Sequence, residues 1–390
     1  MAQPTPPERG VTLLLSAANF VVGMGAFTVI GMLTPLAEDF SVSAATAGWL
    51  MIAYSLGYAV LSPLLVSLTG AMGRRRVLAA GLLICALGNL AAALAPSFEI
   101  LLTARIVAAA GAGLVTPVAA AVAAGLSPPE RRARSLASAF FGFTISQVLG
   151  VPAGSFIAYT FGWQAAFALV FVFCLPVLVL IWRRVPAGLS YEPVSLAALG
   201  RILLSPRHVL VISFTSVFVS GTYVVFTYIS PLMTERMGFG RDGITALLLL
   251  FGLGSVFGNM LGGHLTDRIG WTRTLGLLAI LQAMILPWFS ALPFPMAVVL
   301  GLAFLWSCFG WSFNPSQQTR LIALDPANAA VLLALNGAAV YIGTALGSLI
   351  GAGVLEVAGL DGLGIAGAVI VLSSLVILAA GERARARIAT

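Results

Sequence analysis

The stretch that decides the fold is Leu68–Leu78, Leu-Thr-Gly-Ala-Met-Gly-Arg-Arg-Arg-Val-Leu, a short polar turn between two long apolar runs. A similar stretch, Leu-Thr-Asp-Arg-Ile-Gly-Trp-Thr-Arg-Thr-Leu, occupies Leu265–Leu275. The two share Leu, Thr, Gly, Arg and Leu at matching places, separated by about half the chain. A recurrence at this spacing predicts two similar halves with the same orientation, as in many membrane transporters.

A second match supports the duplication. Its four residues in the first half recur in the second at nearly the same separation: Gly150, Gly154, Ser155 and Ile157 become Gly343, Gly347, Ser348 and Ile350. Either match alone can arise by chance in so apolar a sequence. Two matches at nearly one spacing favour a repeat.

Composition decides the class of protein. Hydrophobic residues make up 60% of the chain and charged residues 8%, and the mean hydropathy is +1.05. A soluble domain carries roughly 25% charged residues, so this chain lacks the polar surface that a soluble protein needs. We therefore predict an all-α integral membrane protein. The net charge of +7 does not indicate nucleic-acid binding, because the arginines lie at segment ends and not on one face.

About twelve apolar segments are each long enough to cross a hydrocarbon core of ~30 Å. They must be helices, because backbone polar groups in lipid need partners within their own segment. We expect them near residues 11–35, 44–69, 77–96, 100–124, 135–159, 164–182, 208–233, 243–264, 272–290, 294–316, 327–353 and 360–380. The resulting organisation is a disordered tail (1–10), a six-helix bundle (11–184), a cytoplasmic linker (185–207), a second six-helix bundle (208–380) and a basic tail (381–390).

Arginine placement predicts the orientation. With the N-terminus inside, the cytoplasmic loops and the two tails hold seventeen of the twenty basic residues, whereas the opposite side holds only Arg236 and Arg241. Cytoplasmic loops carry this kind of excess. We expect a multi-pass protein of the bacterial inner (plasma) membrane with both termini in the cytoplasm.

The sequence carries no pattern of an enzyme or a metal site. No Ser/His/Asp set and no phosphate-binding glycine loop is present, and the three cysteines fall inside apolar runs, where they are expected to pack as small residues. We therefore expect no catalytic residues, no metal and no cofactor. The expected partners are a small-molecule substrate and the lipid bilayer, with no nucleic acid, for a protein that acts as a monomer.

Arg105, in the fourth segment, is the only charge well inside a predicted span. Charged residues at this depth are costly and often functional. Arg105 is either a cation that faces a cavity or a structural arginine bonded to backbone carbonyls or extending to the interface.

Uncharged polar residues inside the spans are candidates for lining a cavity, because amides and phenols suit neutral solutes. Each can instead bond a neighbouring helix. With Arg105, the cavity candidates are Asn19, Tyr54, Gln147, Tyr223, Tyr228, Asn336 and Tyr341. Trp306 and Trp311 are further candidates, for stacking on a ring. The fifth segment holds small residues and an internal proline, which suit a helix bend at a contact and hence a gate: Gly142, Gly150, Pro152 and Gly154.

These features resemble the major facilitator superfamily over nearly the whole chain. The run Gly263-x-Leu265-x-Asp267-Arg268-x-Gly270 is similar to the family's loop between the second and third helices of a half, which forms a cytoplasmic latch. The resemblance implies latch roles for Asp267, Arg268 and Arg273, with Arg74 and Arg76 in the first half. There Gly70 and Ala71 replace the expected Asp and Arg.

Further motifs are similar to the sugar-efflux, or arabinose-efflux-permease-like, branch of the drug:proton antiporters. They are Gly162-Trp163-x-x-x-Phe167, Thr227-Tyr228-Ile229-Ser230-Pro231, Pro315-x-Gln317-Gln318-Thr319-Arg320, Leu335-Asn336-Gly337 and Tyr341-Ile342-Gly343. Arg105 with Gly111 and Gly113 resembles the fourth-helix motif that is linked to proton coupling in the family, and Gly142–Gly154 resembles the fifth-helix motif of its antiporters, a feature of efflux. The resemblance thus implies proton antiport. Ala112 replaces a histidine that many relatives have, and arginine does not titrate at neutral pH.

The sequence thus predicts a secondary transporter that exports a small organic solute (a sugar, a nucleoside or a drug such as chloramphenicol) by rocker-switch alternating access driven by a proton gradient. Two alternatives remain. One is a proton-independent facilitator or importer of a small polar solute. The other is a membrane sensor or scaffold that transports nothing.

Overall fold

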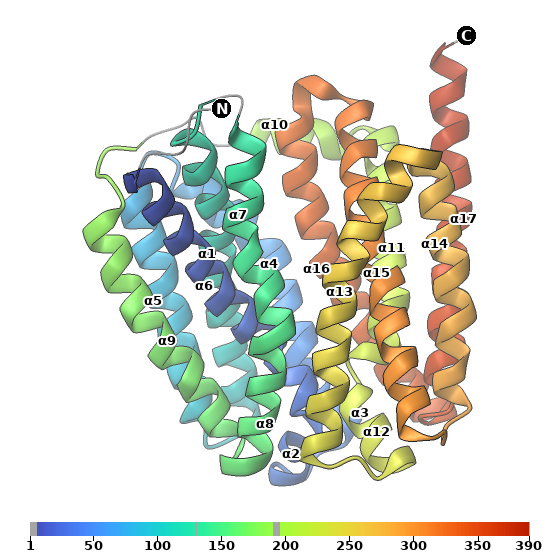
Figure 1. Cartoon of the computed structure of the whole chain (residues 1–390). Helices are drawn as coiled ribbons and strands as arrows, with labels where there is room; N and C mark the ends of the chain where they lie inside the picture. The colour runs from blue at the N-terminus through green and yellow to red at the C-terminus, as the bar shows by residue number, and fades with distance from the viewer. Residues whose placement is uncertain (1–5, 129–130, 190–195, 390) are drawn as a thin grey trace.

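The computed structural model describes residues 6–128, 131–189 and 196–389, and nearly all of them are helical (Figure 1). The first half contains α1 (Pro6–Gly31), α2 (Leu33–Asp39), α3 (Ala44–Ala47), α4 (Trp49–Leu68), α5 (Arg74–Ala93), α6 (Phe98–Gly125), α7 (Arg132–Ile145), η2 (Ser146–Gly150), α8 (Val151–Phe161) and α9 (Trp163–Arg184). The linker holds α10 (Leu196–Leu203). The second half contains α11 (Pro206–Phe226), α12 (Ile229–Met237), α13 (Arg241–Ile269), α14 (Trp271–Ile285), η3 (Leu286–Ser290), α15 (Met296–Leu324), η4 (Pro326–Asn328), α16 (Ala329–Ala358) and α17 (Gly362–Ala389).

The described residues form 12 helical segments long and apolar enough to cross a membrane. This confirms the predicted all-helical fold. Four spans are composite. The second, Ala44–Leu68, joins α3 and α4, and the ninth, Trp271–Ser290, joins α14 and η3. The fifth, Arg134–Phe161, joins α7, η2 and α8, and the seventh, Pro206–Met237, joins α11 and α12.

The spans form two groups that stand side by side in Figure 1, α1 to α9 in one and α11 to α17 in the other. In each group the fifth span packs closely on the first through its glycines. A side chain at Gly154 of α8 would collide with Thr28 of α1, and one at Gly347 of α16 would collide with the backbone of Ser220 of α11. The repeated small residues thus make the same contact in both halves.

The two ends of the helical bundle are formed by different elements. The start of α1, the end of α17 and α10 lie on one face, called here the termini face, whereas α2, α3 and α12 lie on the opposite face (Figure 1). The linker helix α10 buries Leu199 and Ile202 against Val211 and Leu335 of the second half. Apolar residues three apart share one face of a helix, so α10 packs on the bundle.

The chain ends differ from the predicted boundaries. Helix α1 begins at Pro6, inside the stretch predicted to be a tail, and α17 continues to Ala389 through the basic tail. Alanine, arginine and glutamate all favour helix, so the end of α17 can extend beyond its apolar part. Residues 1–5 lie outside the described residues.

Candidate functional site

An aromatic cluster lies where the two halves meet near the middle of the spans. The ring of Tyr58 in α4 stacks on Tyr341 in α16 with centroids 3.8 Å apart, and Tyr54 lies 6.4 Å from Tyr341. Phe27 in α1 lies 6.4 Å from both Tyr341 and Tyr223. All five side chains are buried. These residues, the central aromatic cluster, bring α1 and α4 of the first half onto α11 and α16 of the second.

Arg105 lies beside this cluster and points into the protein. Its Nη1 donates to the carbonyl oxygen of Gly25 at 2.6 Å and its Nη2 to that of Ala26 at 2.8 Å. Its guanidinium carbon lies 4.3 Å from the centre of the Tyr54 ring, and the side chain is fully buried. Arg105 therefore bonds the backbone of α1 and also contributes a fixed positive charge next to the interface.

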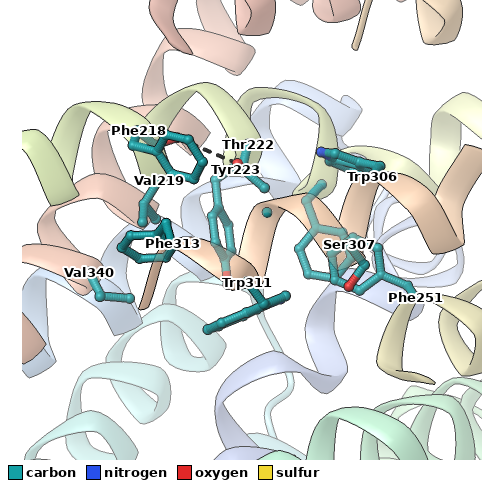
Figure 2. Close-up of a pocket in the computed structure, with 12 residues that line it drawn as sticks. Phe218, Val219, Thr222, Tyr223, Phe251, Trp306, Ser307, Trp311, Phe313 and Val340 are labelled. Atoms are coloured by element: carbon teal, nitrogen blue, oxygen red, sulfur yellow. Dashed lines mark hydrogen bonds between the residues drawn. The ribbon is translucent and has the colours of Figure 1, made fainter. Parts of the chain in front are cut away.

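A pocket opens on the second-half side of the interface. The empty space inside the pocket and in front of its mouth totals about 370 Å³ with open solvent included, whereas the space open to the centre of a water molecule is about 20 Å³. The lining comes from four helices (Figure 2). The lining residues are predominantly aromatic: Phe218, Val219, Thr222, Tyr223, Phe226, Phe251, Trp306, Ser307, Gly310, Trp311, Phe313 and Val340. Three buried polar atoms of this lining have no hydrogen-bond partner, the hydroxyls of Tyr223 and Ser307 and the indole nitrogen of Trp306. Such unpaired groups are uncommon in folded proteins.

The halves are also joined at the opposite face, by hydrogen bonds between side chains. The hydroxyl of Ser230 in α12 lies 2.9 Å from that of Thr34 in α2 and 3.0 Å from that of Tyr159 in α8. The guanidinium carbon of Arg241 lies 4.7 Å from the ring centre of Phe156. Ser230 of the second half thus joins two elements of the first half on this face. The interface is therefore closed at the opposite face.

The fifth span is interrupted at η2, a π-helical turn over Ser146–Gly150. Pro152 lacks the amide proton that would continue the α-helical ladder, and the amide of Val151 instead bonds the carbonyl of Ser146. Single π-helical turns often occur at functional sites. The turn places Gln147 against Gly252 of α13, where a side chain would collide with the Gln147 backbone, and the amide nitrogen of Gln147 has no partner.

The remaining gate glycines lie on the contact between the fifth and first spans. A side chain at Gly142 would collide with the carbonyl oxygen of Ser16, and one at Gly150 would crowd Met24. Any tilt of the fifth span must therefore move α1 with it.

Three predicted cavity residues bond neighbouring helices of their own half. The amide nitrogen of Asn19 donates to the carbonyl of Ala139 at 3.0 Å. The amide oxygen of Asn336 accepts from the hydroxyl of Thr215 at 2.6 Å. The Tyr228 hydroxyl donates to the carbonyl of Ser348 at 2.7 Å. Tyr54, Tyr223 and Tyr341 lie together at the interface.

The predicted latch residues lie on the termini face. The side chains of Arg76, Asp267, Arg268 and Arg273 are exposed. Arg74 is fully buried, and its guanidinium donates to the carbonyl of Gly70 at 3.4 Å. Gly70, which replaces the expected Asp, thus contributes a backbone acceptor to this arginine.

Sequence reasoning missed the phenylalanines of the pocket and Ser230. Phe218, Phe251 and Phe313 carry no signal that separates a pocket wall from a lipid-facing helix surface. Ser230 lay inside the quoted motif Thr227–Pro231, but nothing in the sequence marked it as a contact between the halves.

The profile of the Major Facilitator Superfamily matches residues 15–332. The chain belongs to this family. As a member it is a multi-pass membrane transporter and not an enzyme, and the predicted family is confirmed. The superfamily transporter is 32% identical to the uncharacterized MFS-type transporter YtbD of Bacillus subtilis over 92% of this chain and 93% of the relative.

Two further comparisons support the branch and the fold. The transporter is 32% identical to a chloramphenicol resistance protein of Streptomyces lividans over 87% of each chain, an efflux-type relative. The solved structure of a bacterial homolog of the human lysosomal transporter Spinster superposes with a TM-score of 0.77 at 16% identity, covering 98% of each chain. That likeness shows the same fold.

Proposed function

We propose that this protein is an inner-membrane exporter of a small, uncharged organic solute, such as a sugar, a nucleoside or a drug of the chloramphenicol kind. The observation that carries the proposal is the interface at mid-span. There the central aromatic cluster adjoins a pocket with unpaired neutral hydrogen-bonding groups. A solute with apolar and polar parts fits such a site.

Transport would follow from rocking the two halves about this site. The closed opposite face, held by Ser230 with Thr34 and Tyr159, corresponds to the state in which solute enters from the termini face. We place that face in the cytoplasm because of its arginines. The return step requires the Ser230 contacts to separate, which releases solute outside the cell.

Proton antiport is the proposed coupling, and facilitation without protons is the second candidate. The described acidic residues lie in connections or near the ends of helices and not at mid-span, and arginine stays charged across the physiological range. This observation favours the second candidate. The efflux-type relatives favour the first.

The test is transport by the purified protein in liposomes loaded with a panel of radiolabelled solutes: xylose, uridine and chloramphenicol. Protein-dependent movement of at least one solute is expected, with empty liposomes as the control. For antiport, we expect an ionophore that collapses the proton gradient to abolish solute movement against the solute's concentration gradient. Solute movement down that gradient should remain. Facilitation predicts no effect of the ionophore. Movement of none of the solutes, with the protein correctly folded, would contradict export and favour a sensor or scaffold.

A further inference from the structure

The pocket in the second half has the chemistry of a receptor for one kind of ring. We propose that it binds an uncharged aromatic ring that carries a hydrogen-bond acceptor, such as a nitroarene or an aryl ketone, and that this ring is the part of the transported solute recognised by the second half. The inference rests on the proposed function and narrows its substrate class.

The aromatic side chains of the pocket are already packed on one another. Phe226 and Phe251 stack with centroids 4.0 Å apart and planes 14° from parallel, and Trp306 meets the Phe251 ring edge-on at 5.1 Å. Phe218 and Phe313 form another pair, 5.0 Å apart. Rings already held by one another lose little freedom when a further ring binds, so stacking of a flat ligand is favoured.

The indole of Trp306 offers a hydrogen-bond donor to a ligand. Its Nε1–H is a donor and cannot accept, it has no partner, and the side chain is fully buried. In Figure 2 this nitrogen lies on the edge of the indole that is turned toward Thr222 and Tyr223. A buried donor without a partner costs free energy that a ligand acceptor would recover. The unpaired hydroxyls of Tyr223 and Ser307 offer two more positions for the same contact.

The lining of the pocket is uncharged and mostly apolar. None of the twelve lining residues carries a charge at neutral pH. A cationic or anionic ring would lose its hydration without gaining a counter-charge, which is costly. A sugar would bring several hydroxyls, for which this lining offers polar side-chain groups only from Thr222, Tyr223, Trp306 and Ser307. The lining therefore selects against ions and sugars.

The pocket is also linked to the moving interface. Tyr223 lines the pocket and lies 6.4 Å from Phe27 of the first half within the central aromatic cluster. A ring bound against Tyr223 would therefore contact the boundary along which the halves rock. Trp311, half-buried at the pocket, supplies the most accessible indole of the lining.

The experiment is equilibrium dialysis of the purified full-length protein with radiolabelled chloramphenicol, an uncharged nitrophenyl compound, with competition by simple arenes. We expect saturable binding, displaced by 4-nitrobenzyl alcohol. Displacement should be at least tenfold weaker by 4-methylbenzyl alcohol, which lacks the ring acceptor, and by 4-nitrobenzylammonium, which is charged. Absence of saturable binding, or equal competition by all three, overturns the proposal.

Variants locate the site. Trp306→Phe keeps a ring but removes the donor and should weaken binding about tenfold, the size of one hydrogen bond of about 1.4 kcal/mol. Trp288→Phe, at an exposed indole outside the pocket, is the matched control and should bind as wild type. If Trp306→Phe does not fold, Ser307→Ala and Trp311→Ala replace it, each with an expected loss of at least threefold. A folded set of variants with wild-type affinity overturns the proposal.

The outcome separates this inference from export itself. Export of xylose or uridine without arene binding leaves the proposed function standing and overturns the ring pocket. Arene binding without transport of any solute supports ring binding in the pocket but contradicts export, and with it the assignment of the ring to a transported solute.

Discussion

The ring of Tyr58 in the first half lies on the ring of Tyr341 in the second, with centroids 3.8 Å apart and planes 22° from parallel. The two side chains are the closest aromatic pair of the interface and are both buried. Each also lies in the middle of its helix, α4 or α16. Rocking of the halves must change this contact, so the pair contributes to the balance between the two states.

Removing this stack should therefore shift that balance. Tyr341→Ala loses a ring contact worth about 1 kcal/mol, so we expect the open population of the opposite face to rise about fivefold. The measurement is the distance distribution between spin labels on cysteines introduced at the exposed Ser43 and Glu235. Phe161→Ala, at a largely exposed ring, should leave the distribution unchanged. An unchanged distribution in Tyr341→Ala would remove the stack from the switching mechanism.

Ser230 offers a second way to open the same face. Ser230→Ala removes both hydroxyl contacts, to Thr34 and to Tyr159. Each is worth about 1 kcal/mol, so the long-distance population in the same label experiment should rise by tenfold or more. Thr160→Ala is the matched control, because its hydroxyl bonds a carbonyl of its own helix. A closed face in Ser230→Ala, with normal folding, would show that apolar packing alone seals it.

The helices and the repeat could be predicted because they depend on average properties of the sequence. Long apolar runs bounded by arginines predict spans directly, and glycines such as Gly154 and Gly347 recur because both halves need close contact between the first and fifth spans. The partner of each interface ring could not be predicted. Phe161 is largely exposed and Phe226 is buried, yet both are phenylalanines in apolar surroundings, since lipid and protein interior are equally apolar.

The polar residues inside the spans could be identified from the sequence, but their hydrogen-bond partners could not be predicted. Asn336 bonds Thr215, and Arg105 bonds carbonyl groups of α1. Every residue has a backbone carbonyl group, so the sequence does not indicate which carbonyl a side chain will bond. Pro152 was expected to bend its helix, whereas the π-helical turn beside it, which places Gln147 at the interface, depends on packing against α1 and α13.

Arg105 should be required for both stability and transport. Arg105→Ala leaves the carbonyls of Gly25 and Ala26 without their cationic donor, at a cost of about 1–3 kcal/mol, and removes the charge beside Tyr54. We expect a lower Tm in detergent and loss of transport, with the protein still inserted in the membrane. Arg105→Lys keeps the charge but lacks the planar pair of donors, so its Tm should fall between the two. Full transport by a folded Arg105→Ala would assign the residue a purely structural role.

Asp267 should affect the rate of transport without affecting stability. Its side chain is exposed on the termini face in the state described here, so Asp267→Asn removes no buried contact and should leave Tm unchanged. If Asp267 pairs with arginines when that face closes, the variant destabilises only the closed state and turnover should fall severalfold. Initial rates in liposomes and Tm measured on one preparation separate these effects. Glu235→Gln, an exposed acid on the opposite face, is the matched control and should keep the wild-type rate. Wild-type turnover in Asp267→Asn would show that closure of the termini face does not depend on this carboxylate.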